Sequence, residues 1–286
     1  MKLQVLKYSA VLSLLIAGYS CKKTFAPAEE AFFITAGDVK IDVQPGQGFG
    51  SHKITELWLY SNGIYRGAYP LGSKMPVILK DGKATVDVFA GIMNNGIPET
   101  RLNWLLYEPI KFDTSLKSGE NITRNFTFKY RSPVKFLWVE NFELPGFSLV
   151  RSANSDTTFK VNTNNSHVFE GNRSVEFGLS GNSLIAQVES AASYSVPMAA
   201  GSGNVYLEID YKCNTEFEVG VVSNGLFTQA LVVSDKENWN HIYIQLSNAV
   251  NADPSTPFKK IAFRIRRNSS IGEQKVYLDN VKLVYL

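Results

Sequence analysis

The stretch LWLYSNGIYRGAY, residues 57–69, decides the fold class of this chain. Two runs rich in aromatic and branched side chains flank the tripeptide Ser61-Asn62-Gly63. Asn-Gly between two such runs is the strongest short-range signal for a β-hairpin, because both residues accept the positive φ that a tight turn requires. The stretch therefore predicts two antiparallel strands joined by a two-residue turn.

Similar strand and turn signals recur on both sides of this stretch. Residues 77–79 and 84–89 are apolar runs that flank Asp81-Gly82, and residues 122–130 (ITRNFTFKY) alternate apolar and polar side chains. No part of the mature chain shows the 3.6-residue apolar period of a convincing helix. About seven strands in some hundred residues, with turns every 8–12 residues, are typical of an immunoglobulin-like sandwich. We predict an all-β fold, with this sandwich over residues 31–131.

A second β domain is predicted over residues 132–286. Pro133 marks the boundary, because proline does not continue a central strand. Beyond it, three segments alternate apolar residues with polar ones and so have one face for a core and one for solvent or a ligand. Strands of this kind over such a length favour a jelly roll of two stacked sheets. The three segments are residues 205–213, 241–246 and 261–266.

Length and composition narrow the function classes. The chain has 286 residues, which is comfortable for two domains. Its 19% charged and 12% aromatic residues are typical of globular domains with substantial cores. The formal net charge is only +3, and lysines at the N-terminus contribute much of it. The folded part lacks the basic surface that neutralises phosphates, which excludes nucleic acid as a partner.

The first residues resemble a lipoprotein signal. A positive segment ends at Lys7, an apolar stretch follows over residues 10–18, and Ser20-Cys21 comes next. The apolar stretch is too short for a permanent membrane helix. We predict a signal peptide over 1–20, a lipid such as palmitate on Cys21, and a lipidated tether over 21–30. The alternative is ordinary cleavage after Ser20, which would release a free secreted protein.

The second cysteine, Cys213, has no partner if lipid consumes Cys21. It lies in phase with apolar neighbours, and we interpret it as a small buried hydrophobic residue. The alternative is a reactive thiol.

Several motifs resemble those of known proteins. In the first domain they include residues 54–63, 90–97 and Thr100-Arg101; in the second they include Asn141-Phe142-Glu143 and residues 277–281. The first set is similar to an N-terminal immunoglobulin-like domain of Bacteroidota outer-membrane lipoproteins. The second set is similar to the galactose-binding-like jelly roll of carbohydrate-binding modules. The resemblance implies a protein anchored to the outer membrane, with the cell surface favoured over the periplasmic face.

The resemblance also implies a structural calcium. In many such modules this ion joins the first and last strands through acidic residues that match Glu143 and Asp279, with Glu170 as a neighbour. Calcium prefers six to eight hard oxygen ligands, which carboxylates and carbonyls supply. The alternative is that both carboxylates accept hydrogen bonds from backbone amides at strand ends. No other cofactor is required.

Candidate carbohydrate-binding residues lie on the polar phase of the second domain's strands. Tyr206 and Tyr243 are candidates for stacking on sugar rings. Arg264 and Arg266 share one strand face and are candidates for gripping an acidic sugar or a lipid phosphate. The alternative for the arginines is a solvated strand face. Three of the four tryptophans are expected in the cores, namely Trp58, Trp138 and Trp239.

No catalytic residues are assigned. The three histidines, His52, His167 and His241, do not have the spacing of a metal or nucleophile motif. The first hypothesis is therefore a non-catalytic surface lipoprotein that captures glycan. The second is an accessory subunit that docks on an outer-membrane protein. An enzyme is a third interpretation, which two facing carboxylates in a cleft of the second domain would favour.

Overall fold

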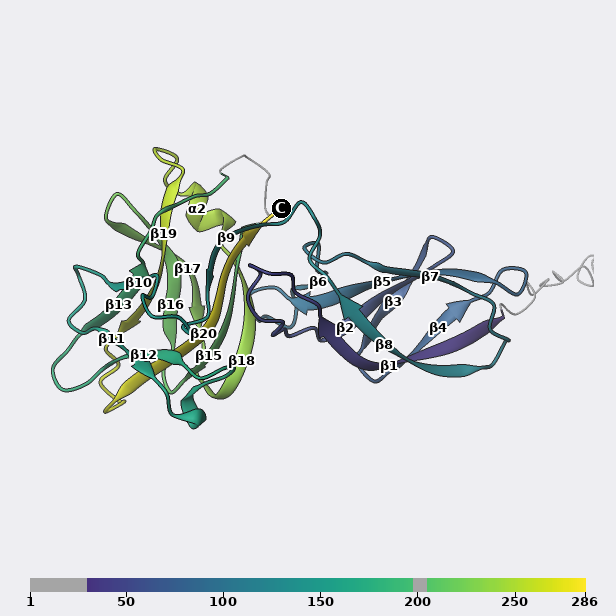
Figure 1. Cartoon of the computed structure of the whole chain (residues 1–286), viewed down its shortest axis with the longest axis horizontal. Coiled ribbons are helices and arrows are strands. Elements are labelled where there is room, and N and C mark those ends of the chain that lie inside the picture. The colour runs from purple at the N-terminus through teal and green to yellow at the C-terminus, as the bar shows by residue number, and fades with distance from the viewer. Residues whose placement is uncertain (1–29, 198–204) are drawn as a thin grey trace, which may run out of the picture.

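The structure is a computed structural model that describes residues 30–197 and 205–286. The chain is all-β, as predicted, and forms two successive sandwiches (Figure 1). The predicted signal peptide, Cys21 and the tether up to residue 29 lie outside the described residues. Within the described ranges, no helix is long and apolar enough to cross a membrane.

The first sandwich contains the strands β1 to β8. Its two sheets have the strand orders β4-β1-β8 and β3-β2-β5-β6, and β7 also pairs with β5. β1 runs parallel to β8, whereas the other pairs are antiparallel. The strands are β1 (Ala31–Ile41), β2 (Glu56–Ser61), β3 (Ile64–Pro70), β4 (Lys74–Ile78), β5 (Ala84–Met93), β6 (Arg101–Asn103), β7 (Ile110–Thr114) and β8 (Asn121–Phe128).

Both predicted turns are present in this sandwich, but only the first one joins two paired strands. Asn62 and Gly63 connect β2 to β3 with φ angles of 53° and 75°. Asp81 and Gly82 form a turn before β5 with φ angles of 52° and 71°. These are the left-handed conformations that Asn-Gly and Asp-Gly adopt in such turns. The local sequence therefore decides where the chain reverses. The prediction of a hairpin at Asp81-Gly82 is wrong, because β4 pairs with β1 in one sheet and β5 pairs with β2 and β7 in the other.

The second sandwich contains β9 to β20 and two short helical turns. The strands are β9 (Lys135–Glu140), β10 (Leu149–Arg151), β11 (Phe159–Asn162), β12 (Ser174–Leu179), β13 (Ile185–Ser190), β14 (Tyr194–Ser195), β15 (Val205–Cys213), β16 (Phe217–Ser223), β17 (Leu226–Val233), β18 (Lys236–Gln245), β19 (Phe258–Arg266) and β20 (Gln274–Tyr285). The helical turns are η1 (Asn165–His167) and α2 (Ser247–Asn251).

Two antiparallel sheets stack in this second sandwich. One has the order β10-β13-β19-β16-β17, with β14 paired to β19. The other has the order β11-β12-β20-β15-β18, with β9 paired to β20. Their facing apolar side chains, such as Leu207, Ile209, Phe263 and Ile265, form one buried core. The side chains on the two outer faces are therefore what a ligand or a second domain can contact.

The two sandwiches lie end to end along the longest axis of the molecule (Figure 1). The predicted boundary at residues 131–132 falls between β8 and β9. β20, the last strand, is buried over nearly its whole length. An edge or surface strand would show alternation, so something covers both of its faces. On the outer face, the first sandwich covers the end of β20 around Lys282 and Val284, and residues 167–170 of the second sandwich cover Tyr277 and Asp279.

Candidate functional site

The first sandwich covers the sheet face that the sequence assigns to solvent or a ligand. Tyr206 and Tyr243 are 6% and 1% exposed, and both pack within the core of the first sandwich. The indole ring of Trp104, just after β6, lies 4.6 Å from the Tyr206 ring and 4.7 Å from the Tyr243 ring, between centroids. The prediction that these tyrosines stack on sugar rings is therefore wrong, because protein rings occupy the space.

Two hydrogen bonds of Asn95, one through its backbone and one through its side chain, also hold this junction together. The amide of Asn95 donates to the carbonyl of Tyr243 over 2.9 Å. The amide of Gln245 in turn donates to the side-chain oxygen of Asn95 over 2.8 Å. Asn95 and Gly96 form a turn with positive φ angles, which these two residue types tolerate. The segment of residues 94–97 thus docks on β18 through fixed geometry.

A buried ionic network lies inside the junction. Glu208 on β15 is fully buried and accepts a hydrogen bond of 2.6 Å from the hydroxyl of Tyr130. Lys282 on β20 is 1% exposed, and its ammonium group donates to the carbonyl of Phe49 in the first sandwich. Burial lowers the pKa of Lys282, whereas the nearby charge of Glu208 opposes this effect. The first sandwich therefore supplies hydrogen-bond partners, a hydroxyl and a carbonyl, to buried charged groups of the second.

His241 and Asp210 form a second buried pair. Nδ1 of His241 lies 2.8 Å from a carboxylate oxygen of Asp210, and Asn280 donates to the other oxygen over 2.9 Å. Such a pair resembles the histidine and carboxylate of a catalytic dyad. However, Nε2 of His241 is itself buried and, among the described residues, has no hydrogen-bond partner. A substrate cannot reach that nitrogen without moving its neighbours, so the pair is structural in this conformation.

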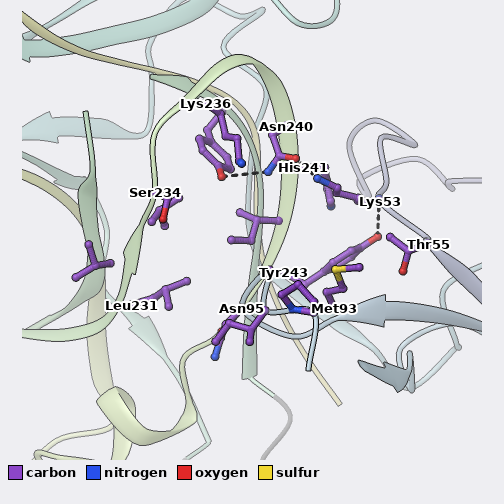
Figure 2. Close-up of a pocket in the computed structure, with 17 residues that line it drawn as sticks. Lys53, Thr55, Met93, Asn95, Leu231, Ser234, Lys236, Asn240, His241 and Tyr243 are labelled. Atoms are coloured by element: carbon purple, nitrogen blue, oxygen red, sulfur yellow. Dashed lines mark hydrogen bonds between the residues drawn. The ribbon is translucent and has the colours of Figure 1, made fainter. Parts of the chain in front are cut away.

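A groove opens beside this junction, between residues of both sandwiches (Figure 2). Its volume is about 340 Å³, which lies at the lower end of the range of small-ligand sites. Figure 2 shows Lys236 and Asn240 at the top, Lys53 and Met93 toward the right, and Leu231 at the left, around the space between them. The apolar lining can contact the face of a ring, and the amide and ammonium groups can bond to hydroxyl or acidic oxygens. We take this groove as the candidate functional site.

The polar groups of the groove are held in place by each other. The ammonium group of Lys53 donates to the side-chain oxygen of Asn240. The amide nitrogen of Asn240 donates to the hydroxyl of Tyr211 over 3.1 Å. The backbone amide of Lys53 donates to the hydroxyl of Tyr243 over 3.1 Å. These contacts fix one side of the groove before any ligand binds.

Arg264 and Arg266 share one strand face, as the sequence predicts, but a carboxylate joins them. Both guanidinium groups pair with Glu218 of β16, and the Arg266 pair measures 3.1 Å. Arg264 also lies 3.7 Å above the ring of Phe227. Only Arg266, with 61% of its side chain exposed, has much contact with solvent. Because Glu218 offsets their charge, this face is a weaker anion site than the sequence suggests.

The residues predicted to hold calcium both accept hydrogen bonds from one loop. Glu143 accepts from the amides of Asn172 and Arg173 over 2.8 and 2.9 Å. Asp279 accepts from the amides of Phe169 and Glu170 over 3.2 and 3.3 Å. Across residues 30–197 and 205–286, no group of three or more His, Cys, Asp or Glu side chains could hold a metal. This geometry favours the capping alternative, and the calcium site stays a prediction.

Electrostatics differ between these two carboxylates. Burial raises the pKa of Glu143, but the amide hydrogen bonds from Asn172 and Arg173 outweigh that effect and lower it overall. Burial raises the pKa of Asp279 to about 7, although the amides of Glu170, Asn280 and Phe169 oppose the rise. Glu143 is therefore the firmer anchor of the loop at neutral pH.

The remaining sequence predictions have mixed outcomes. Cys213 is buried in the core of the second sandwich, as predicted, and is free among the described residues. Burial raises the pKa of its thiol to about 11, which disfavours the reactive thiolate. Trp138 is buried as predicted, at 3% exposure. Trp239 is half-buried against Phe169, with ring centroids 5.7 Å apart.

Trp58 is not in a core, contrary to the prediction. Leu57 and Leu59 point inward on β2, so Trp58 and Tyr60 lie on the outer face of the sheet. Tyr65, which is 46% exposed, lies 5.5 Å from Trp58 and 5.2 Å from Tyr60, between ring centroids. Phe89 completes the cluster, 5.3 Å from Tyr60. We call these four residues the open aromatic face; strict alternation around Leu57 was the signal that could have located it.

No protein-family model and no curated protein matches the sequence. Among solved structures, the chain is similar to TmCBM61, a protein solved in complex with β-1,4-galactotriose. That match has 14% identity and a TM-score of 0.32, and it covers 54% of this chain and 90% of the other. A second is the K2 cleaved adhesin domain of Lys-gingipain, with 14% identity, a TM-score of 0.36, and coverage of 54% and 98%.

A third similar structure is a cyclase from Fischerella sp. TAU. It has 12% identity and a TM-score of 0.39, and the match covers 53% of this chain and 97% of the cyclase. The similar structures thus include a binding module, an adhesin domain and a cyclase, each with a TM-score below 0.5. A similar fold does not determine function. The function of this protein is therefore inferred from the residues of the groove.

Proposed function

We propose that this protein is a lipid-anchored, outer-membrane protein of the cell surface that captures polysaccharide without transforming it. The observation that carries the proposal is the groove between the two sandwiches. Its side chains combine apolar surface with amide and ammonium groups, which suits the alternating apolar faces and hydroxyl edges of sugar rings. A volume of about 340 Å³ gives room for a small part of a chain, so the rest of a polysaccharide would extend outside.

The rigid junction supports a binding role. Ligand affinity improves when the site needs little reordering, because less conformational entropy is lost on binding. The rings of Trp104, Tyr206 and Tyr243 and the Asn95 hydrogen bonds hold the two walls of the groove together. The buried Nε2 of His241 supports the absence of catalysis at this site. These features suit recognition better than turnover.

Glycan capture through the groove is tested by filling it. Ser234 lines the groove and is exposed, so a Ser234→Trp protein can fold while its indole occupies the space. We expect affinity electrophoresis in polysaccharide gels to show retention of the native protein and its loss in Ser234→Trp. The matched control is Ser180→Trp, an exposed serine of a turn outside the groove. Retention that survives in Ser234→Trp would place the ligand elsewhere, and no retention on any polysaccharide would refute the proposal.

The anchor is tested separately. In cells fed a clickable fatty acid, we expect the native protein to be labelled and the Cys21→Ala protein to remain unlabelled, because the thiol carries the lipid. Two or more acyl chains make membrane attachment effectively permanent, at about 0.8 kcal/mol per buried methylene. The native protein should therefore sediment with membranes. Label that persists in Cys21→Ala would remove the anchor from the proposal.

The open aromatic face favours one alternative, an accessory subunit that docks on an outer-membrane protein. Contiguous exposed apolar surface is typical of protein interaction sites. Beside Tyr65, the tip of the β2–β3 hairpin also exposes Ile64, at 57%. A stoichiometric partner recovered from detergent-solubilised membranes by the native protein, but not by Tyr65→Asp, would favour docking over glycan capture.

A further inference from the structure

We infer that the groove selects polysaccharides that carry acidic groups, with Lys53 and Lys236 as the residues that bind those groups. This inference rests on the proposed function and names the chemical class of its ligand. The acidic groups are uronate carboxylates or sulfate esters on sugar residues, which share a negative charge and exposed oxygen acceptors.

The first argument is the charge of the lining. Lys53 comes from the loop before β2 and Lys236 from the start of β18, so each sandwich contributes one ammonium group to the groove. None of the 17 residues drawn around the groove is Asp or Glu. Asp235 and Glu237, the chain neighbours of Lys236, are not part of the lining. The groove therefore has a positive rim, with no lining carboxylate to offset it.

The second argument is that neither lysine is neutralised. Between residues of the described ranges, neither ammonium group forms an ion pair. This contrasts with Arg264 and Arg266, which share Glu218. Partial burial lowers the pKa of Lys53, and the nearby charge of Lys236 lowers it further. Two like charges held near each other are unfavourable, and an anion placed between them would relieve that repulsion.

The third argument is positioning. Lys53 donates to Asn240, and Asn240 donates to Tyr211, so the Lys53 ammonium group is held at the rim instead of extending into solvent. A lysine ammonium has three donors. With one donor on Asn240, two remain for a ligand's oxygens. The adjacent apolar side chains, including Leu231 and Met93, provide contact for the ring that carries the acidic group.

The experiment uses the lipidated mature protein in neutral detergent micelles and two pairs of probes. Polygalacturonate is compared with its methyl-esterified form, and dextran sulfate with dextran; each pair shares a backbone and differs in charge. We expect binding of at least one acidic probe, and binding of its uncharged counterpart weaker by at least about tenfold, as two partly exposed charge contacts imply. Raising the salt from about 0.05 M to about 0.5 M should weaken it further, because screening shortens the range of these contacts.

The lysines themselves are tested by a charge-matched pair of variants. The double variant Lys53→Gln with Lys236→Gln should lose about tenfold or more in affinity for the acidic probe. The control double variant, Lys111→Gln with Lys160→Gln, removes the same charge from exposed lysines, one in each sandwich, that lie outside the groove. It should bind as the native protein does. Both variants remove side chains at the surface, so folding should be preserved, which circular dichroism checks.

The outcomes separate this inference from the proposed function. Binding to polygalacturonate alone, to dextran sulfate alone or to both supports the inference and identifies the acidic group. Equal binding to charged and uncharged probes, or unchanged binding by the Lys53/Lys236 variant, overturns the inference and leaves glycan capture standing. Loss of the same size in the control variant shows a nonspecific charge effect and also overturns it. Failure to bind any polysaccharide, charged or neutral, refutes the proposed function as well.

Discussion

Replacing Trp104 by Ala should lower the free energy of unfolding by about 3–5 kcal/mol, the usual cost of truncating a buried tryptophan. Trp104 is 1% exposed, and its ring lies within 5 Å of both Tyr206 and Tyr243, between centroids. Its indole nitrogen has no hydrogen-bond partner among the described residues, so the loss comes from packing alone. Denaturant titration of the mature chain without lipid measures the change.

The same variant should also separate the unfolding of the two sandwiches. Tyr206, Tyr243 and Val284 belong to the second sandwich by sequence and to the core of the first by packing. A shared core couples the two domains, so calorimetry of the native protein should show one transition, and that of Trp104→Ala two. The control is Trp239→Ala, which truncates a half-buried tryptophan that is not part of the shared core and should cost less, about 1–2 kcal/mol. Equal losses in both variants would show that Trp104 has no special role in coupling.

The sequence predicts the fold class well because the decisive signals are local. Asn62-Gly63 and Asp81-Gly82 take the positive φ values that their residue types favour, whatever the rest of the chain does. Alternation likewise identifies Leu207 and Ile209 as core residues of the second sandwich. The residue preferences of turns and the alternation of side chains along a strand are set by a few neighbouring residues. Both can therefore be recognised in a single sequence.

The sequence predicts the candidate site poorly because the site depends on the packing of one domain on another. Tyr206 and Tyr243 lie on the polar phase of their strands, and alternation cannot tell whether solvent, a ligand or a second domain meets that phase. Glu208 and Asp210 look like solvent-facing charges in the sequence, yet both are fully buried. One signal of an interface was present in the sequence. Two tyrosines and two acidic residues share one face of the β15–β18 pair, and the preceding domain has several aromatic residues in its loops.

The groove could not be predicted from the sequence for a related reason. Lys53, Asn95 and Lys236 come from three distant parts of the chain, and no motif joins them. Of the segments singled out by resemblance, residues 90–97 do contribute a wall of the groove through Asn95. The sequence does not predict the opposite wall of the groove, which β17 and β18 form. The two walls come together only once both sandwiches have folded.

Replacing Lys282 by Met should destabilise the protein by about 3–5 kcal/mol at neutral pH, because it leaves buried carboxylates without their cation. Methionine matches the length of the lysine stem, so little packing is lost. Lys282 is 1% exposed, and Glu208 and Asp210 are fully buried near it. The control is Lys275→Met on the same strand, whose side chain is 31% exposed and pairs with Glu176 and Glu273. An exposed pair of this kind should cost less than about 1 kcal/mol.

The pH dependence distinguishes lost charge from lost packing. Without Lys282, the buried negative charge beside it has no nearby cation, and this uncompensated charge disfavours the folded state. Protonation of a buried carboxylate at low pH removes such a charge, and this relief is lost as the pH rises. Denaturant titrations at several pH values should therefore show the deficit of Lys282→Met shrinking as the pH falls from about 8 to about 4. A second change, Glu208→Gln, should restore part of the stability at neutral pH, because it removes one unpaired charge. A deficit that stays constant with pH and is not reduced by Glu208→Gln would mean that Lys282 stabilises the junction by packing and that the buried network is not held by its charge.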